Sequence, residues 1–319
     1  MGNDPASYLE DSFLGDLLKK EGLTDLSYNG RDLYFATNAR GREKAEKQPS
    51  VAEVGDFLRQ IANLSEKQFS FSSPILDVSF GRYRLNAVYQ SLARVCNEKT
   101  YTFSLRLASP HCRIEEDPTF FGGESKSLLL GILHQGESIM IGGKTSSGKT
   151  ELEKFLLGEM APASRVIVID NVEELDMVEN PRIDLSMWLV NESLKDATFS
   201  ALIKNALRNN PDYIMVAEAR GGEMLDGLLS SMSGHPIISS VHAQDIEAMP
   251  ERIARLAMLG NERLYKEELL DDIAHHLRYY VYLEKKENPD GSLSRHLQSI
   301  GYLDEKSKTM QKLYERSHE

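Results

Sequence analysis

The feature that most constrains this chain is an eight-residue loop between an apolar run and a helical run. The loop has the pattern G-x-x-x-x-G-K-T and consists of Gly143, Lys144, Thr145, Ser146, Ser147, Gly148, Lys149 and Thr150. Residues 138–142 before it form a short apolar run typical of a buried strand, and residues 151–157 after it read as the first turns of a helix. A strand, a glycine-rich turn and a helix in this order are the context of a phosphate-binding loop.

The chemistry of this loop follows from its backbone. The amide groups of residues 144–150 can surround a polyphosphate, and the helix that starts there adds the positive end of its dipole. Lys149 would reach the β- and γ-phosphates, and the hydroxyl of Thr150 would bind Mg²⁺. Four constrained positions match by chance in about 1% of chains of this length, and the correct flanks make such a match rarer. The loop therefore predicts a nucleotide-binding site.

Composition describes an ordinary globular protein. Its 319 residues are enough for two domains, and 41% of them are hydrophobic. The net charge of −12 leaves no excess of positive charge, so we expect no direct binding to nucleic acid. Cys96 and Cys112 form neither a disulfide framework nor a metal-spaced cluster. Without a membrane-spanning run or a signal region, we expect a cytoplasmic protein whose membrane association is peripheral.

A change in the pattern of apolar residues along the sequence divides the chain into two predicted domains. Residues 1–112 are expected to form a small α+β domain. Its helices are expected at 8–20 and 51–64, and its strands at 26–28, 33–36, 75–80, 83–89 and 100–107. Residues 113–127 contain proline, two glycines and acidic residues, and are the predicted linker.

Residues 128–319 alternate strands with helices, which is typical of an α/β domain with a mainly parallel sheet. Buried strands are expected at 138–142, 165–170, 213–218 and 236–242, helices at 199–208, 223–232 and 264–277, and a strand pair at 279–283 and 296–302. Parallel strands place their carboxyl ends along one edge of the sheet, where the ligand also binds. Side chains that follow these strands should therefore meet at the phosphate loop.

Several strand ends carry groups that nucleotide hydrolysis needs, above all a carboxylate for Mg²⁺ or for the attacking water. Asp170 closes one buried run, and Glu173 and Glu174 follow within four residues. Glu218 closes a second run and His242 closes a third. These five residues are the candidates for chemistry at the edge of the sheet.

Each candidate also has an ordinary structural interpretation. An acid that follows a strand can cap the next helix. Glu218 could form a structural ion pair with Arg220 or Arg208, and His242 could be a hydrogen-bonded turn histidine. Their joint occurrence after a complete phosphate loop favours the catalytic interpretation.

Further blocks resemble the secretion-ATPase superfamily. Residues 207–220, LRNNPDYIMVAEAR, look like its L-R-x-x-P-D-x-I-x-x-G-E-x-R block. Residues 234–243 resemble its histidine box, and residues 169–175, IDNVEEL, resemble its aspartate box I-E-D-x-x-E. Residues 14–30 look like the first domain of the conjugation-type (type IV secretion) traffic ATPase. The resemblance covers about residues 10–285.

This resemblance implies a homo-hexameric ring whose subunits have an N-terminal domain and a RecA-like motor domain. ATP would lie between the two domains of one subunit, with neighbours completing the site. It implies that Glu174 orients or deprotonates the attacking water, that Glu218 acts through Mg²⁺ and that His242 senses the γ-phosphate. Arg84 and Arg106 match arginines that reach phosphates in relatives. An exposed strand arginine paired with a neighbouring acid is the alternative for Arg106.

The implied function is ATP hydrolysis by the motor of a type IV (conjugation-type) secretion machine at the cytoplasmic face of the inner membrane. Other components of that machine would be its partners. A type II secretion or type IV pilus motor is one alternative. Those relatives often carry a four-cysteine metal subdomain, which Cys96 and Cys112 alone cannot form. A nucleotide-dependent switch with little hydrolysis is the other, because the aspartate box opens with Asp170 and Asn171 instead of Glu-Asp. Ser146 also stands where relatives usually carry glycine.

Overall fold

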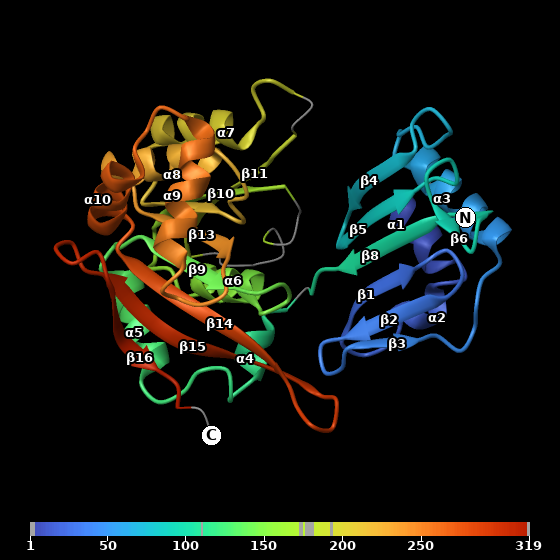
Figure 1. Ribbon diagram of the computed structural model, residues 1–319, viewed down its shortest axis with the longest axis horizontal. Coiled ribbons are helices and arrows are strands. Elements are labelled where there is room, and N and C mark those ends of the chain that lie inside the picture. The colour runs from blue at the N-terminus through green and yellow to red at the C-terminus, as the bar shows by residue number, and fades with distance from the viewer. Residues whose placement is uncertain (1–3, 110, 172–174, 176–181, 192–193, 318–319) are drawn as a thin grey trace. The chain divides into compact units, whose positions relative to one another are not determined.

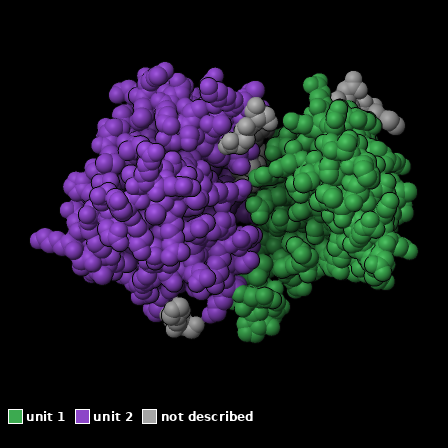
Figure 2. Space-filling view, turned by 45° about the horizontal axis from the view of Figure 1, so that its top comes forward, with its two compact units in different colours: residues 1–110, 287–294 green, residues 111–286, 295–319 purple. Residues whose placement is uncertain are grey.

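The computed structural model describes residues 4–109, 111–171, 175, 182–191 and 194–317. The chain forms two compact units (Figure 1), which Figure 2 colours separately. The first contains Met1–Pro110 and Glu287–Ser294, and the second contains His111–Lys286 and Arg295–Glu319. An α+β unit is followed by a unit with a mainly parallel sheet, so the predicted fold class is confirmed.

The first unit is built on a six-stranded sheet with the order β3-β2-β1-β8-β5-β4, in which all neighbours pair antiparallel. Alternate strand residues point into a core that they share with three helices. The elements are α1 (Pro5–Glu10), α2 (Gly15–Leu18), β1 (Leu23–Tyr28), β2 (Leu33–Thr37), β3 (Arg42–Lys44), α3 (Val51–Leu64), β4 (Ile75–Phe80), β5 (Tyr83–Val88), β6 (Arg94–Val95), β7 (Glu98–Lys99) and β8 (Thr102–Leu107).

Helix α3 begins and ends where the apolar spacing predicts. The Ser50 hydroxyl accepts a hydrogen bond from the Glu53 N–H at 3.2 Å, and the Glu53 carboxylate accepts one from the Ser50 N–H at 2.8 Å. This reciprocal capping box satisfies two amide groups at the start of the helix. The helix then buries Val54, Phe57 and Ile61 against the sheet.

The predicted helix over residues 8–20 is wrong in its extent, because the chain forms two short helices there, α1 and α2. The Ser12 hydroxyl donates a hydrogen bond to the Leu9 carbonyl at 2.6 Å and accepts one from the Leu14 N–H at 3.2 Å. Such local side-chain bonds compete with the helical pattern of the backbone. The apolar spacing survives, since Leu9, Leu14 and Leu18 all enter the core.

The second unit has three layers, with helices on both faces of an eight-stranded sheet (Figure 1). The strand order is β11-β10-β12-β13-β9-β14-β15-β16, and β11 through β14 in this order all run parallel to their neighbours. The elements are α4 (Arg113–Glu116), α5 (Ser125–His134), β9 (Ile139–Gly143), α6 (Lys149–Gly158), β10 (Arg165–Asp170), β11 (Asp184–Leu189), α7 (Phe199–Ala206), the 3₁₀ turn η1 (Leu207–Asn209), β12 (Tyr213–Val216), α8 (Glu223–Met232), β13 (Ile237–His242), α9 (Met249–Gly260), α10 (Lys266–His276), β14 (Tyr279–Glu287), β15 (Leu293–Leu303) and β16 (Met310–Glu315). Helix α4 and the start of α5 thus lie within the predicted linker, residues 113–127.

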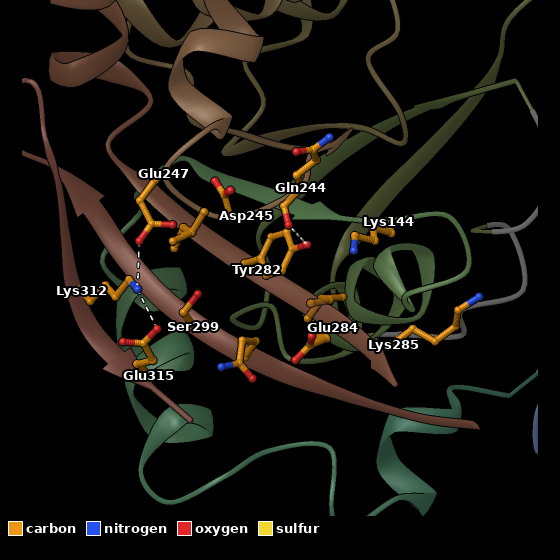
Figure 3. Close-up of a pocket in the computed structure, with 13 residues that line it drawn as sticks. Lys144, Gln244, Asp245, Glu247, Tyr282, Glu284, Lys285, Ser299, Lys312 and Glu315 are labelled. Carbon is orange, nitrogen blue, oxygen red and sulfur yellow. Dashed lines mark hydrogen bonds and ion pairs between the residues drawn. The ribbon is translucent and has the colours of Figure 1, made fainter. Parts of the chain in front are cut away.

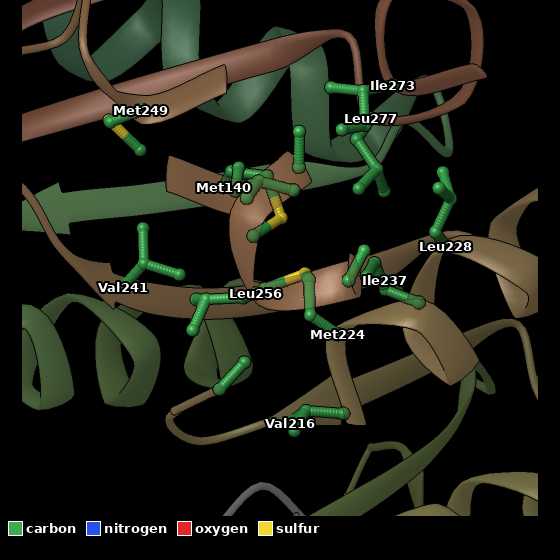
Figure 4. Close-up of a cluster of buried hydrophobic side chains, with 14 of the residues drawn as sticks. Met140, Val216, Met224, Leu228, Ile237, Val241, Met249, Leu256, Ile273 and Leu277 are labelled. Atoms are coloured by element: carbon green, nitrogen blue, oxygen red, sulfur yellow. The ribbon is translucent and has the colours of Figure 1, made fainter. Parts of the chain in front are cut away.

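Successive residues of the central strands enter two different apolar clusters, one on each face of the sheet. Met140 joins Val216 and the helices α7 to α10, and Figure 4 shows the middle of this cluster. Ile139 and Ile141 join α4, α5 and α6 on the other face. Burial on both faces explains why these strands read as continuous apolar runs. None of the helices among the described residues is both long and apolar enough to cross a lipid bilayer.

Two strands of this sheet, β11 and β16, were not predicted. Both are edge strands. Their residues are mostly half-buried or exposed, so they lack the continuous apolar run of the central strands. The predicted strand over residues 213–218 ends earlier, at Val216, which leaves Ala217 and Glu218 beyond its carboxyl end.

We predict opposite effects of alanine at two helical glycines. A Cβ on Gly55 in α3 would lie 2.6 Å from Cε2 of Tyr101, a buried ring whose hydroxyl accepts a hydrogen bond from Arg59. A Cβ on Gly131 in α5 would meet nothing within 4 Å. Alanine favours a helix by about 1 kcal/mol over glycine. We expect G131A to raise the melting temperature measured by circular dichroism and G55A to lower it. A higher melting temperature in both variants would mean that the Tyr101 ring leaves room for a methyl group on Gly55.

Candidate functional site

Strand β9 leads directly into the phosphate loop, and helix α6 begins at Lys149. Gly148, which precedes the helix, has a left-handed backbone with φ +100°, a conformation that glycine adopts without steric cost. A Cβ on Gly143 would lie 2.3 Å from the Ser147 hydroxyl oxygen and 2.8 Å from the Leu283 carbonyl oxygen. Both glycines of the pattern are therefore required by the path of the loop.

The interior of the loop fits a polyphosphate. Lys149 is only 8% exposed, and its Nζ lies 3.4 Å from the carbonyl oxygens of Gly143 and Lys144. The Ser147 hydroxyl is buried with no hydrogen-bond partner among the described residues. A buried hydroxyl without a partner is costly unless a ligand completes its bonding. A buried ammonium and an unsatisfied hydroxyl at the start of a helix are suited to an anion.

Two predicted side chains meet Lys149 at the carboxyl edge of the sheet. His242 ends β13, and its Nδ1 lies 3.4 Å from the Lys149 Nζ. Its Nε2 lies 2.8 Å from Oε1 of Glu218, which follows β12. The other carboxylate oxygen of Glu218 accepts a hydrogen bond from Arg220 at 2.7 Å. The structure thus brings Lys149, Glu218 and His242 together, and Glu218 also makes the ion pair that the structural interpretation expected.

The electrostatics of this cluster define its protonation states. Burial raises the pKa of the Glu218 carboxyl, but Arg220, His242 and Lys149 outweigh it and bring that pKa below its ordinary value. Burial and the Lys149 charge lower the pKa of His242, although Glu218 opposes them. At neutral pH Glu218 is therefore ionised and His242 is neutral. The 3.4 Å contact fits a neutral ring whose Nδ1 accepts from the Lys149 ammonium. The ring proton then lies on Nε2, which faces Oε1 of Glu218 at 2.8 Å.

A carboxyl group that the sequence analysis missed lies one turn after Lys149. Glu153 on α6 is fully buried, and neither of its oxygens has a hydrogen-bond partner among the described residues. Burial above all, and then the charge of Asp170, raise the pKa of Glu153 well above its ordinary value, although Ser240 and Lys149 oppose them. Glu153 is therefore held as the neutral acid. Its spacing of four from Lys149, which puts both on one face of the helix, was the available signal.

The remaining predicted site residues are Asp170, Thr150, Glu173 and Glu174. Asp170 is the last residue of β10 and is 6% exposed. Its backbone carbonyl accepts a hydrogen bond from the Val190 N–H at 2.8 Å. Thr150 is the second residue of α6. Glu173 and Glu174 lie outside the described residues, so the assignment of the water-activating base to Glu174 stays a prediction.

The two predicted arginines lie in the first unit. Arg106 on β8 lies 3.6 Å from Asp25, and Arg84 on β5 lies 3.4 Å from Asp77. The alternative interpretation of Arg106 expected such a pairing with a neighbouring acid. The two arginines are also direct partners across the strand pair β5–β8. Like charges in directly opposed positions destabilise a sheet, and here Asp77 and Asp25 each compensate one of the two arginines.

A separate cavity of about 270 Å³ lies at the same end of the sheet (Figure 3). Lys144 is the residue that it shares with the phosphate loop. Lys312 in its wall pairs with Glu247 at 2.9 Å and with Glu315 at 2.6 Å. Because Lys312 already lies between two carboxylates, this part of the cavity is negative, and the cluster around Lys149 is the better candidate for binding phosphate.

The buried acid predicts a pH-dependent stability difference. Between the unfolded pKa of glutamate, about 4.3, and its raised folded pKa, the folded state holds one more proton than the unfolded state. The free energy of unfolding therefore falls as pH rises in that window, by up to about 1.4 kcal/mol per unit. E153Q removes this loss. We expect urea unfolding to show a larger gain in stability for E153Q over wild type at pH 8 than at pH 6.

The control for this prediction is E267Q, at an exposed position in the first turn of α10. Its stability relative to wild type should be the same at both pH values. An E153Q gain that does not change with pH would mean that Glu153 is ionised in the folded protein.

Comparisons with known proteins agree with this fold and loop. Residues 105–280 match the family described as Type II/IV secretion system protein. An uncharacterised protein of Bacillus anthracis is 27% identical over 268 residues, which cover 82% of this chain and 59% of that relative. The type IV secretion system protein PtlH of Bordetella pertussis is 36% identical over 147 residues, 44% of this chain and 42% of the relative.

The X-ray structure of the Legionella pneumophila ATPase DotB is similar with a TM-score of 0.65 and 21% identity, over 95% of this chain and 81% of that chain. At this identity the similarity shows the fold. This chain spans 59% of the length of the Bacillus relative. The predicted resemblance to secretion ATPases, and within them to the conjugation type, is confirmed by the family match and by PtlH. The family match covers more than half of the residues, and the chain belongs to the Type II/IV secretion system protein family.

Proposed function

We propose that this protein hydrolyses ATP and uses the energy to drive a type IV, conjugation-type secretion machine. The observation that carries the proposal is the contact of Lys149 with His242, which in turn contacts Glu218. It places an ammonium, a neutral imidazole and a carboxylate at the mouth of a complete phosphate loop. Membership of the secretion family and the similarity to PtlH support the assignment to a secretion machine.

The residues would divide the work between binding and hydrolysis. Lys149 and the amide groups of residues 144–150 would hold the β- and γ-phosphates, and Ser147 would donate its unsatisfied hydroxyl to them. Thr150 and Glu218 supply the hard oxygen atoms that Mg²⁺ prefers, and the ion would neutralise charge on the phosphates. Glu174 would orient or deprotonate the attacking water.

His242 is suited to sense the γ-phosphate. As a neutral ring it contacts Lys149 on one side and Glu218 on the other. A γ-phosphate that draws the Lys149 ammonium toward itself would weaken the contact at Nδ1. His242 would then be free to shift with the phosphate, so the presence of ATP could be transmitted to strand β13.

The first unit would contribute cations to the same reaction. Arg84 and Arg106, directly opposed on β5 and β8, would reach the phosphates of the same subunit or of a neighbour. Arginines supplied in this way can accelerate phosphoryl transfer by about 10³-fold or more. Arginines that reach the phosphates of a neighbour would require a ring, which we propose to be a homo-hexamer. We place it at the cytoplasmic face of the inner membrane, with other components of the secretion machine as partners and peripheral membrane contact.

A nucleotide-dependent switch that barely hydrolyses ATP is the second candidate. The observation that favours it is the short acid at the end of β10, Asp170, followed by the uncharged Asn171. The two candidates share the binding site and differ only in turnover.

Binding and hydrolysis should separate in two variants. K149A removes the cation of the loop, so we expect nucleotide binding, measured by isothermal titration calorimetry, and ATPase activity to fall to background. E174Q removes the base and keeps the shape, so binding should persist while turnover drops by about 10²-fold or more. K67A, which removes an exposed lysine beyond the end of α3, is the control and should behave as wild type.

Wild-type turnover in a folded K149A protein would refute the site. Normal turnover in E174Q would move the role of the base to Asp170, Glu173 or Glu218. Tight binding by the wild-type protein with turnover that E174Q does not lower further would establish the switch.

Removing Arg106 should lower the ATPase activity, whereas removing its ion-pair partner Asp25 should not. If Arg106 reaches a phosphate, R106A should lower the turnover per subunit by about 10³-fold. D25A removes only the ion-pair partner at 3.6 Å and should leave turnover nearly unchanged. Equal losses of turnover in R106A and D25A would mean that Arg106 only forms a structural ion pair.

The proposed ring has its own test. Turnover per subunit should rise with protein concentration, and a non-hydrolysable ATP analogue should shift sedimentation toward the ring. A fully active monomer would contradict the ring.

A further inference from the structure

Ser146, at the tip of the phosphate loop, adopts a left-handed backbone with φ +61°. Residues other than glycine seldom occupy this region, because the Cβ atom crowds the backbone there. The resemblance to secretion ATPases puts glycine at this position, where the conformation has no such cost. In this chain the loop therefore needs an additional contact to hold its tip in place.

Arg295 supplies a contact of this kind. It is the third residue of β15, and its Nε donates a hydrogen bond to the Ser146 carbonyl oxygen at 2.8 Å across 149 positions in the chain. Its Cδ lies 3.9 Å from a Cβ placed on Gly148, on which the Phe120 ring also closes at 3.8 Å. The side chain thus passes along the loop from Gly148 to its tip.

The start of β15 is itself anchored. The Leu297 N–H, two residues after Arg295, donates a hydrogen bond to the Phe120 carbonyl at 2.9 Å. Leu297 is fully buried in the apolar cluster that α6 shares with β9. The strand is therefore anchored two residues from Arg295, whose side chain reaches the loop from there.

We propose that Arg295 is a positioning residue for nucleotide binding, which holds the strained Ser146 peptide in the conformation that the phosphates require. The peptide unit is planar, so fixing the Ser146 carbonyl also fixes the direction of the Ser147 N–H. That N–H donates a hydrogen bond to the Lys144 carbonyl oxygen at 3.2 Å, which closes the turn at the tip of the loop over residues 144–147. The inference deepens the proposed function and rests on it, since it concerns the same nucleotide site.

The rival explanation is that the Arg295 charge attracts the phosphates directly. The two differ in their dependence on Ser146. Glycine at this position would adopt the left-handed backbone unaided, so a positioning role for Arg295 would largely disappear in the S146G background. A direct attraction would act equally in both backgrounds.

The experiment uses the full chain and compares wild type, R295A, S146G and the double variant R295A/S146G. Affinity is measured by fluorescence titration with a fluorescent ADP derivative. Hydrogen–deuterium exchange of residues 143–150 is measured without nucleotide, which reads the loop directly. R255A, which removes one exposed arginine on α9, is the control for net charge and should match wild type.

We expect R295A to bind the nucleotide about tenfold more weakly than wild type and to exchange its loop amides faster, with an unchanged melting temperature. In the S146G background the same change should alter affinity by less than about twofold. Equal weakening in both backgrounds, or no change in affinity or exchange in R295A, would overturn the proposal. If wild type fails to bind nucleotide, the proposed function fails, and the exchange measurement still decides whether Arg295 holds the loop.

Discussion

The parallel pairing of β13 with β9 is the constraint on which the candidate site depends. Its register sets His242 directly opposite Gly143, the first residue of the phosphate loop. The next pair in the sheet, β12 with β13, then carries Glu218 past the end of β12 to within 2.8 Å of the same histidine. A slip of one residue would turn His242 toward the other face and separate it from Lys149. The apolar clusters on both faces oppose such a slip, because neighbouring apolar residues such as Ile237 and Ile238 belong to different clusters.

Charge at this edge is balanced within a small volume. Lys149 is buried and needs a compensating negative charge, which the ionised Glu218 supplies through His242. Glu153 lies close to the same groups but is kept neutral by its complete burial. A further ionised carboxylate beside Glu218 and Asp170 would leave the site more negative and would oppose the binding of polyphosphate. The neutral acid therefore preserves the attraction of the loop for anions.

Part of this picture could be read from local patterns. The phosphate loop and the buried strands β9, β10, β12 and β13 follow from a motif and from continuous apolar runs. The edge strands β11 and β16 could not be found in this way, because they bury too little surface to leave an apolar run. The division of the first helix at Ser12 depended on a hydroxyl that bonds to the Leu9 carbonyl, which periodicity does not detect.

The amino-acid sequence by itself determined the loop, its flanks, the candidate acids after the strands and the resemblance to secretion ATPases. Each of these depends on residues close together in the chain, where spacing reports the local backbone. Only the tertiary structure decided that His242 contacts Lys149 across 93 positions, that Glu153 is a neutral acid and that Arg295 reaches Ser146 across 149. These features depend on strand register and on complete burial. Both are properties of the packed sheet as a whole, so no local pattern encodes them.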